Sequence, residues 1–117
     1  MRSKKIIKPW GYELLIEKNN KYMFKKLFMK KGHRCSLQYH KKKIETIFIV
    51  SGTLKIFYGK NKNNLKYKIF KSQNTITINP KMIHRMQAVN DCIYLEASTP
   101  EITDVVRLSD DYDRCVI

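Results

Sequence analysis

The stretch SLQYHKKKIETIFIVSG, residues 36–52, places a glutamine, a histidine and a glutamate around three lysines and then continues into an apolar segment. Successive side chains of a β-strand point to opposite faces, so Gln38 and His40 share one face of a strand. The lysines form a turn, and Glu45 opens the next strand, which we expect to pair antiparallel with the first. Three side chains that can bind a metal therefore converge at one end of a predicted hairpin.

The rest of the chain has the same strand-and-turn character. Short segments rich in β-branched or aromatic residues alternate with turn residues, and few stretches show a helical period. Ser51-Gly52 predicts a two-residue hairpin loop between the strands 45–50 and 53–59. The other expected strands are 12–17, 22–29, 34–40, 65–70, 74–79, 84–89 and 92–97, with a last one around 105–108. About nine or ten short strands at near-regular spacing predict an all-β sandwich or closed barrel.

Composition limits the class of protein. A chain of 117 residues with 43% hydrophobic residues can build one domain with one core. The formal net charge of +14 would attract anionic partners such as phosphate esters. Most lysines, however, occupy solvent-side strand positions or turns, without the basic stripe and interleaved aromatic residues of a nucleic-acid site. Nucleic-acid binding is therefore the outside alternative.

Cysteine usage and hydropathy give an expectation for the compartment. Three irregularly spaced cysteines form neither a disulfide framework nor a pair of thiolate zinc ligands. The start of the chain is basic but lacks the apolar region of a signal peptide, and no apolar run is long enough to span a membrane. We therefore expect a soluble, cytoplasmic protein with reduced thiols and no membrane partner.

A second histidine strengthens the metal hypothesis. The segment NPKMIHR places His84 at the start of another strand, after Pro80 ends the preceding one. An amide oxygen, two imidazoles and a carboxylate suit zinc or another first-row divalent ion and leave positions open for water or substrate. A lone histidine is more often structural, but Gln-x-His-x4-Glu followed by Pro-x3-His favours a metal site.

These residues also carry a resemblance. Their order is similar to the first cupin motif, Gly-x5-His-x-His-x4-Glu-x6-Gly, with glutamine in place of the first histidine, and to the histidine of the second motif. The matching positions are Gly32, Gln38, His40, Glu45, Gly52 and His84. With the segments KPWGYELL, VSGTLKI and DVVRLSDDYDR, the chain from about Lys8 to Arg114 resembles the C-terminal cupin domain of type II mannose-6-phosphate isomerases.

The resemblance implies a fold, a reaction and a cofactor. The expected fold is a single all-β cupin domain over residues 1–117, a jelly-roll barrel of the double-stranded β-helix type. The implied reaction is aldose–ketose isomerisation of a phosphorylated sugar, in surface-polysaccharide or nucleotide-sugar precursor metabolism. One divalent metal ion is expected, zinc first, with manganese, cobalt, nickel and iron as alternatives. Its implied ligands are Gln38, His40, Glu45 and His84. By analogy with small cupins, we also expect a homodimer.

Further residues take roles by the same resemblance. Arg34, Arg85 and Arg107 fall where the family pattern has basic residues, and they are the expected phosphate-binding groups. Lys43 and Glu96 are the candidates for the catalytic base. Each has a plainer alternative, a solvated turn for Lys43 and a salt bridge to Arg85 for Glu96.

Two features leave the function open at this stage. The family's histidine and tryptophan after the glutamate ligand are replaced by Thr46 and Ile47, and residues beside a metal shape its pocket. Arg107 and the cluster Asp110, Asp111 and Tyr112 could simply latch the tail onto the barrel. The alternatives to an isomerase are a cupin that binds metal and sugar without catalysis, as a sensor or accessory subunit, and a cupin enzyme of other chemistry, such as an epimerase or dioxygenase.

Overall fold

The protein is all-β in this computed structural model, which describes residues 2–101 and 103–114. The strands are β1 (Lys4–Lys8), β2 (Gly11–Lys18), β3 (Met23–Met29), β4 (Leu37–Tyr39), β5 (Glu45–Ser51), β6 (Leu54–Gly59), β7 (Lys66–Phe70), β8 (Thr75–Ile78), β9 (Ile83–Ala88), β10 (Cys92–Ser98) and β11 (Val106–Ser109). None of the described residues forms a helix, and accordingly none belongs to a helix able to cross a membrane. The expected strands are present, and β1 is an addition to them.

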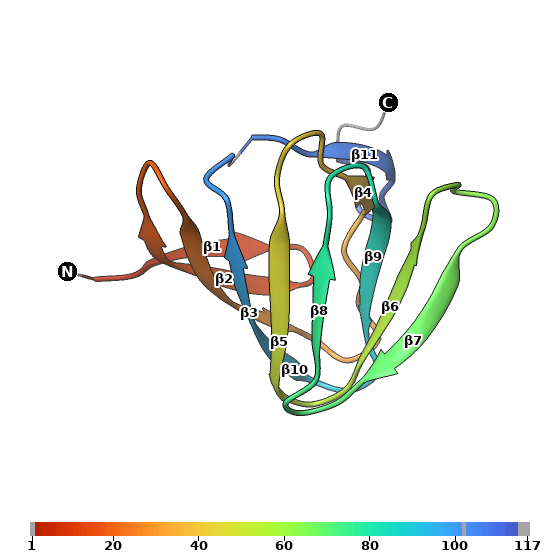
Figure 1. Cartoon of the computed structure of the whole chain (residues 1–117). Helices are drawn as coiled ribbons and strands as arrows, with labels where there is room; N and C mark the ends of the chain where they lie inside the picture. The colour runs from red at the N-terminus through yellow and green to blue at the C-terminus, as the bar shows by residue number, and fades with distance from the viewer. Residues whose placement is uncertain (1, 102, 115–117) are drawn as a thin grey trace.

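The strands form two antiparallel sheets that face each other (Figure 1). The six-stranded sheet has the order β1-β2-β3-β10-β5-β8, and the five-stranded sheet has the order β11-β4-β9-β6-β7. Several neighbouring strands come from distant parts of the chain, among them β3 and β10, β5 and β8, and β4 and β9, as in a jelly roll. The prediction of an all-β cupin barrel is confirmed.

The predicted pairing of the strands around Glu45 is wrong. The strand β4 pairs with β11 and β9, whereas β5 pairs with β10 and β8 in the other sheet. The lysine turn therefore carries the chain from one sheet to the other instead of closing a hairpin. The strands β5 and β6, on either side of Ser51-Gly52, also lie in different sheets. A local turn motif predicts that the chain reverses direction. It does not predict which strands pair by hydrogen bonds, because those partners come from distant segments of the chain.

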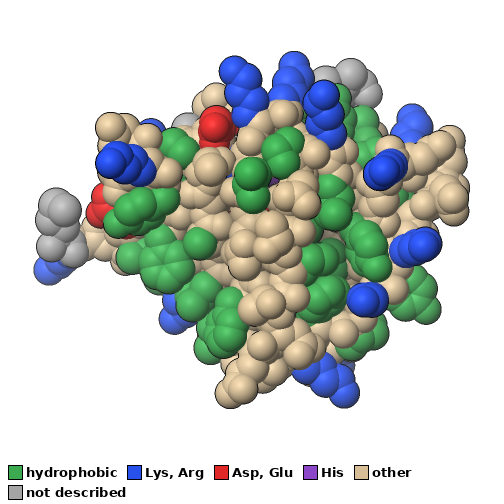
Figure 2. All heavy atoms as spheres, viewed as in Figure 1, with side chains coloured by type: hydrophobic (Ala, Val, Ile, Leu, Met, Phe, Trp, Pro, Cys, Tyr) green, Lys and Arg blue, Asp and Glu red, His purple; other side chains and the backbone are tan. Residues whose placement is uncertain are grey.

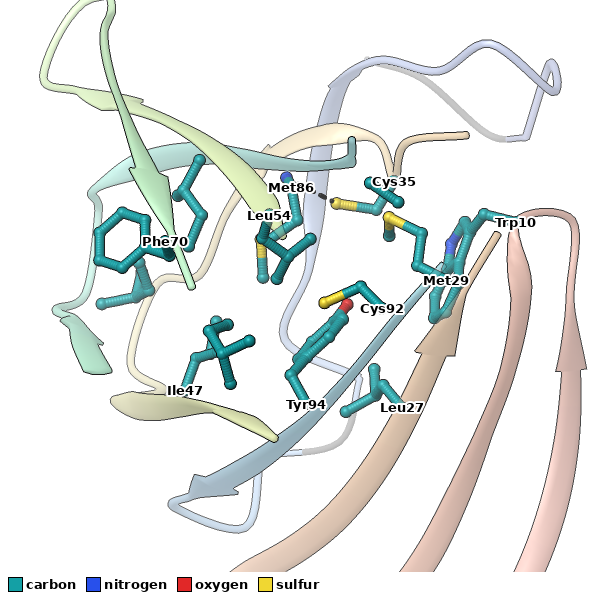
Figure 3. Close-up of a cluster of buried hydrophobic side chains, with 14 residues drawn as sticks. Trp10, Leu27, Met29, Cys35, Ile47, Leu54, Phe70, Met86, Cys92 and Tyr94 are labelled. Carbon is teal, nitrogen blue, oxygen red and sulfur yellow. Dashed lines mark hydrogen bonds between the residues drawn. The ribbon is translucent and has the colours of Figure 1, made fainter. Parts of the chain in front are cut away.

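The interior changes character along the strands. On β5 the inward residues run from Glu45 to Ile47 and Ile49, and on β9 they run from His84 to Met86. One end of the barrel is thus apolar and the other polar. Figure 3 shows the apolar end, where the side chains labelled are Trp10, Leu27, Met29, Cys35, Ile47, Leu54, Phe70, Met86, Cys92 and Tyr94.

The described cysteines belong to this apolar interior. Cys35 and Cys92 are buried free thiols. Burial raises the pKa of Cys35 to about 11 and that of Cys92 to about 12, so both stay protonated at neutral pH. This agrees with the expectation of reduced thiols for these two residues, whereas Cys115 lies outside the described residues.

The outer face of the six-stranded sheet is poor in charge. Outward residues of β5 include Phe48 and Val50, which are 37% and 41% exposed, and outward residues of β10 include Leu95. Lys26 is the outward cation at the centre of β3. In Figure 2 hydrophobic side chains form several groups on this face, while lysines and arginines gather near its rim.

Candidate metal centre

His40, Glu45 and His84 meet inside the polar end of the barrel, although their strands belong to two different sheets. The Glu45 Oε1 atom lies 3.3 Å from His40 Nε2 and 3.2 Å from His84 Nε2. All three side chains are at most 3% exposed. One ligand atom from each residue lies within 4.8 Å of the other two. Sequence spacing placed His40 and Glu45 on one hairpin and His84 on a later strand, and the three residues converge across the interior, between the facing sheets.

Hydrogen bonds to the backbone orient both imidazoles. His40 Nδ1 lies 2.5 Å from the backbone oxygen of Asp104, and His84 Nδ1 lies 2.9 Å from that of Met82. A carbonyl oxygen can only accept, so each Nδ1 carries a proton, and in the neutral ring each Nε2 then presents its lone pair. Both Nε2 atoms are buried and have no hydrogen-bond partner among the described residues. Two unpartnered imidazole nitrogens beside a carboxylate oxygen fit a divalent metal ion.

Glu45 is held in its charged form. Burial opposes ionisation, but contacts from Glu96, His40 and His84 outweigh it and place the pKa of Glu45 well below its usual range. Glu96 shows the opposite shift, because burial and then the charge of Glu45 raise its pKa well above the ordinary value. The pair therefore shares one negative charge, on Glu45, with Glu96 as the hydrogen-bond donor.

Gln38, the fourth expected ligand, lies beside this cluster. It is the register partner of His84 between β4 and β9, and its side chain lines the same cavity. Its Oε1 atom accepts a hydrogen bond of 2.7 Å from Ser36 Oγ. His40, Glu45 and His84 therefore form the cluster, and the side-chain amide of Gln38 lies next to it.

A cavity of about 260 Å³ opens from the histidine–glutamate cluster toward β1, β2 and β3. Its polar lining residues are Lys8, Glu13, Lys25, Gln38, His40, Lys43, Glu45, Glu96, Arg107 and Arg114. The cavity is thus lined by five cationic side chains and three carboxylates. Thr46 points outward and Ile47 belongs to the apolar core, so neither replaced residue lines the cavity.

Lys43 and Arg107 are placed where they can act on a ligand. Lys43 is buried, with its Nζ atom 3.8 Å from Glu45 Oε2, so the alternative of a solvated turn is wrong. Arg107, on β11, is the register partner of Gln38. Its Nε atom is buried and has no hydrogen-bond partner in the described part of the chain. Both side chains are therefore oriented toward the cavity by the fold.

Arg34 and Arg85 lie elsewhere and hold the tail. Arg34 forms two hydrogen bonds with Asp111, of 2.6 and 2.9 Å. Arg85 donates to the backbone oxygens of Cys35 and Ser109. The latch hypothesis for the tail is thus confirmed for Asp111, and the Arg85 contacts differ from the salt bridge to Glu96 considered above. Phosphate binding by Arg34 and Arg85 stays a prediction, since neither lines the cavity.

Sequence reasoning missed two groups that support the site. One is Asp104, whose carboxylate accepts backbone N–H bonds from Lys41, Lys42 and Lys43 and thereby fixes the turn between His40 and Glu45. Its position in an irregular segment gave no signal. The other is the buried pair Glu13 and Lys25. Strand alternation could have found that lysine, because Met23, Lys25, Leu27 and Met29 share one face.

We expect Asp104→Asn to loosen this turn in a pH-dependent way. Slight burial opposes the charge of Asp104, but the three backbone N–H bonds outweigh it and lower its pKa. A carboxylate whose pKa is lower when folded stabilises the protein above its unfolded pKa of about 4 and loses that effect as pH falls through the folded pKa. The variant should melt below the wild type at pH 7, and the difference should shrink below about pH 4.

Calorimetry across this pH range checks the prediction. Asp91→Asn is the control, because that carboxylate accepts one backbone N–H, from Lys31, far from the metal ligands. A difference between Asp104→Asn and the wild type that is constant with pH would contradict the assignment.

The fold defines a class, the barrels of the cupin type, and the buried histidine–glutamate cluster gives this barrel a site able to hold a metal ion. The family model described as mannose-6-phosphate isomerase C-terminal matches residues 1–110, and the chain belongs to this family. No curated protein gives a match.

Solved structures support the fold. The capsular polysaccharide assembling protein CapF from Staphylococcus aureus has a TM-score of 0.75 and 15% identity, over 92% of this chain and 34% of its own. An RmlC-like cupin from Shewanella frigidimarina has a TM-score of 0.75 and 14% identity, over 86% of both chains. Oxalate decarboxylase from Bacillus subtilis has a TM-score of 0.79 and 13% identity, over 91% of this chain and 30% of its own. The chain thus spans about a third of CapF and of the decarboxylase.

Proposed function

We propose that this chain is a metal-dependent isomerase that interconverts the aldose and ketose forms of a phosphorylated sugar, with mannose 6-phosphate as the first candidate. The observation that carries the proposal is the cluster of His40, Glu45 and His84, which has two unpartnered imidazole nitrogens. His40 and Glu45 of this cluster line a cavity that has more cationic side chains than carboxyl groups. Family membership supports the same reaction class.

The residues around the histidine–glutamate cluster each have a defined task in this proposal. His40, Glu45, His84 and Gln38 would hold one divalent ion, zinc first, and such an ion supplies Lewis acidity toward carbonyl and hydroxyl oxygens. The reaction moves a proton between C1 and C2 of the sugar, so it needs a group that takes and returns protons. We assign this transfer to Glu96, whose buried carboxyl group lines the cavity beside Glu45. In the deprotonated form that the transfer requires, a carboxyl group with a raised pKa is a stronger base than an ordinary one.

The cationic residues of the cavity would complement negative charge on the substrate. The Lys43 ammonium group lies beside the metal ligands, where it can stabilise an oxygen that becomes negative during the reaction. Arg107 offers a planar fork of N–H donors to the substrate on the β11 side of the cavity.

The test is a coupled assay of mannose 6-phosphate conversion to fructose 6-phosphate. The protein is stripped of metal and then restored with each divalent ion in turn. We expect turnover with at least one ion, and Glu96→Gln should lower kcat by about 10²–10⁴-fold, the usual contribution of a proton-transferring group. Tight metal binding without turnover would overturn the isomerase proposal in favour of a non-catalytic sugar-binding cupin. Oxygen consumption with iron would indicate a dioxygenase.

We propose further that the chain forms a homodimer through the outer face of the six-stranded sheet. Two copies of a chain with a net charge of +14 repel each other. This face carries Phe48, Val50 and Leu95, with Lys26 as the cation at the centre of β3, so few positive charges of the two copies would lie opposite each other. Sedimentation should give a dimer mass, and Phe48→Lys should shift it toward the monomer. An unchanged dimer in that variant would place the interface elsewhere.

A further inference from the structure

The cavity wall built by β1, β2 and β3 carries a charged cluster that the proposed reaction leaves without a role. Lys25 Nζ lies 3.3 Å from Glu13 Oε1, and Lys8 Nζ lies 4.0 Å from the same oxygen. The Lys25 and Glu13 side chains are only 11% and 9% exposed, and that of Lys8 is 27% exposed. Two ammonium groups share one carboxylate, so the cluster keeps a positive charge that no acid within it balances.

Packing does not require a charge at this position. The other inward residues of β3 are Met23, Leu27 and Met29, and apolar side chains usually stabilise such a site as well as a buried ion pair does. An ammonium group has three N–H donors. Glu13 is the one hydrogen-bond partner of Lys25 Nζ within the described residues, and Lys25 lines the cavity. Its remaining donors are therefore available to a ligand.

The cluster lies at a suitable distance from the metal ligands. Lys25 is the register partner of Glu96 between β3 and β10, and Glu96 contacts Glu45 on the next strand, β5. The strands β3 and β5 are two strand spacings apart, which is about 10 Å. A six-carbon sugar with a terminal phosphate has a comparable length. A substrate with its carbonyl end near Glu45 would thus bring its phosphate toward Lys25.

We propose that Lys25 and Lys8 bind the phosphate group of the substrate and that Glu13 positions the Lys25 ammonium group. The inference rests on the proposed function, because it takes the substrate to be a sugar phosphate. A phosphate monoester fits the cluster better than a neutral sugar does, since its double negative charge complements two ammonium groups that share one carboxylate.

Calorimetric titration of the metal-loaded protein with mannose 6-phosphate, and separately with mannose, tests this directly. The wild type should prefer the phosphorylated sugar, and Lys25→Met should reduce that preference by about tenfold to a hundredfold, the usual effect of losing a hydrogen bond to a charged group. Lys68→Met is the matched control, because Lys68 is an exposed strand lysine on β7, in the other sheet, and does not line the cavity. The double variant Glu13→Gln with Lys25→Met avoids leaving an unpaired buried carboxylate.

The outcomes separate this inference from the proposed reaction, because the titration needs no turnover. Metal content is measured in every variant, so a lost preference with full metal occupancy supports the phosphate site. If Lys25→Met loses the preference for the phosphorylated sugar and the wild type shows no turnover, the phosphate site stands and the isomerase proposal is overturned. An unchanged preference in Lys25→Met and in the double variant, or a wild type that does not prefer the phosphate ester, would overturn the inference. Loss in Lys68→Met as well would show a general charge effect and would also overturn it.

Discussion

His84→Ala should abolish tight metal binding. His84 is fully buried, and its Nε2 atom lies 3.2 Å from Glu45 Oε1 with no other partner in the described part of the chain. Removing residues that only support a ligand typically weakens metal binding 10–100-fold, so removing a ligand itself should weaken it by more than about a hundredfold. Isomerase activity should be lost with the metal.

Metal content and competition with a chelator measure this effect. The matched control is His33→Ala, because His33 contacts Tyr112 of the tail, outside the metal cluster. His84→Ala also leaves space in the barrel, so Glu45→Gln, which nearly conserves volume, serves as a second variant. The metal assignment would be abandoned if both variants bound metal as tightly as the wild type.

Gly52→Ala should cause a large loss of stability. Gly52 has a φ of +83°, and a Cβ atom there would lie 2.2 Å from the backbone oxygen of Asp91 and 2.8 Å from Cys92 Cα. The positive φ alone costs about 1–2 kcal/mol for a residue with a side chain, and relieving the contact requires backbone movement. We expect the free energy of unfolding to fall by about 2–4 kcal/mol, a large share of the usual stability of a domain.

Thermal and urea unfolding measure this loss, and Gly32→Ala isolates its two causes. Gly32 has a similar φ, +81°, but no atom lies within 4 Å of a Cβ built there. That variant should therefore show the conformational cost alone. Equal losses in the two variants would contradict the steric part of the explanation.

Local patterns along the chain were enough to predict most strands, the class of fold and the three residues of the histidine–glutamate cluster. Strand alternation placed Gln38 and His40 on one face, and the spacing to Glu45 and His84 gave a ligand set recognisable without coordinates. These properties are local, because side-chain direction along a strand depends only on the parity of position. The same rule applied to β3 would have shown that Lys25 points inward.

The pairing of the strands and the surroundings of the histidine–glutamate cluster became clear only from the three-dimensional structure. Sequence reasoning closed a hairpin between residue 40 and Glu45, whereas the chain crosses there from one sheet to the other. Likewise, Arg34 and Arg85 hold the tail. Lys25 lines the cavity, although the sequence pattern indicated that most lysines are solvent-exposed. Strand partners and cavity walls come from contacts between distant segments, and burial of the whole barrel selects among them, so no local pattern could report them.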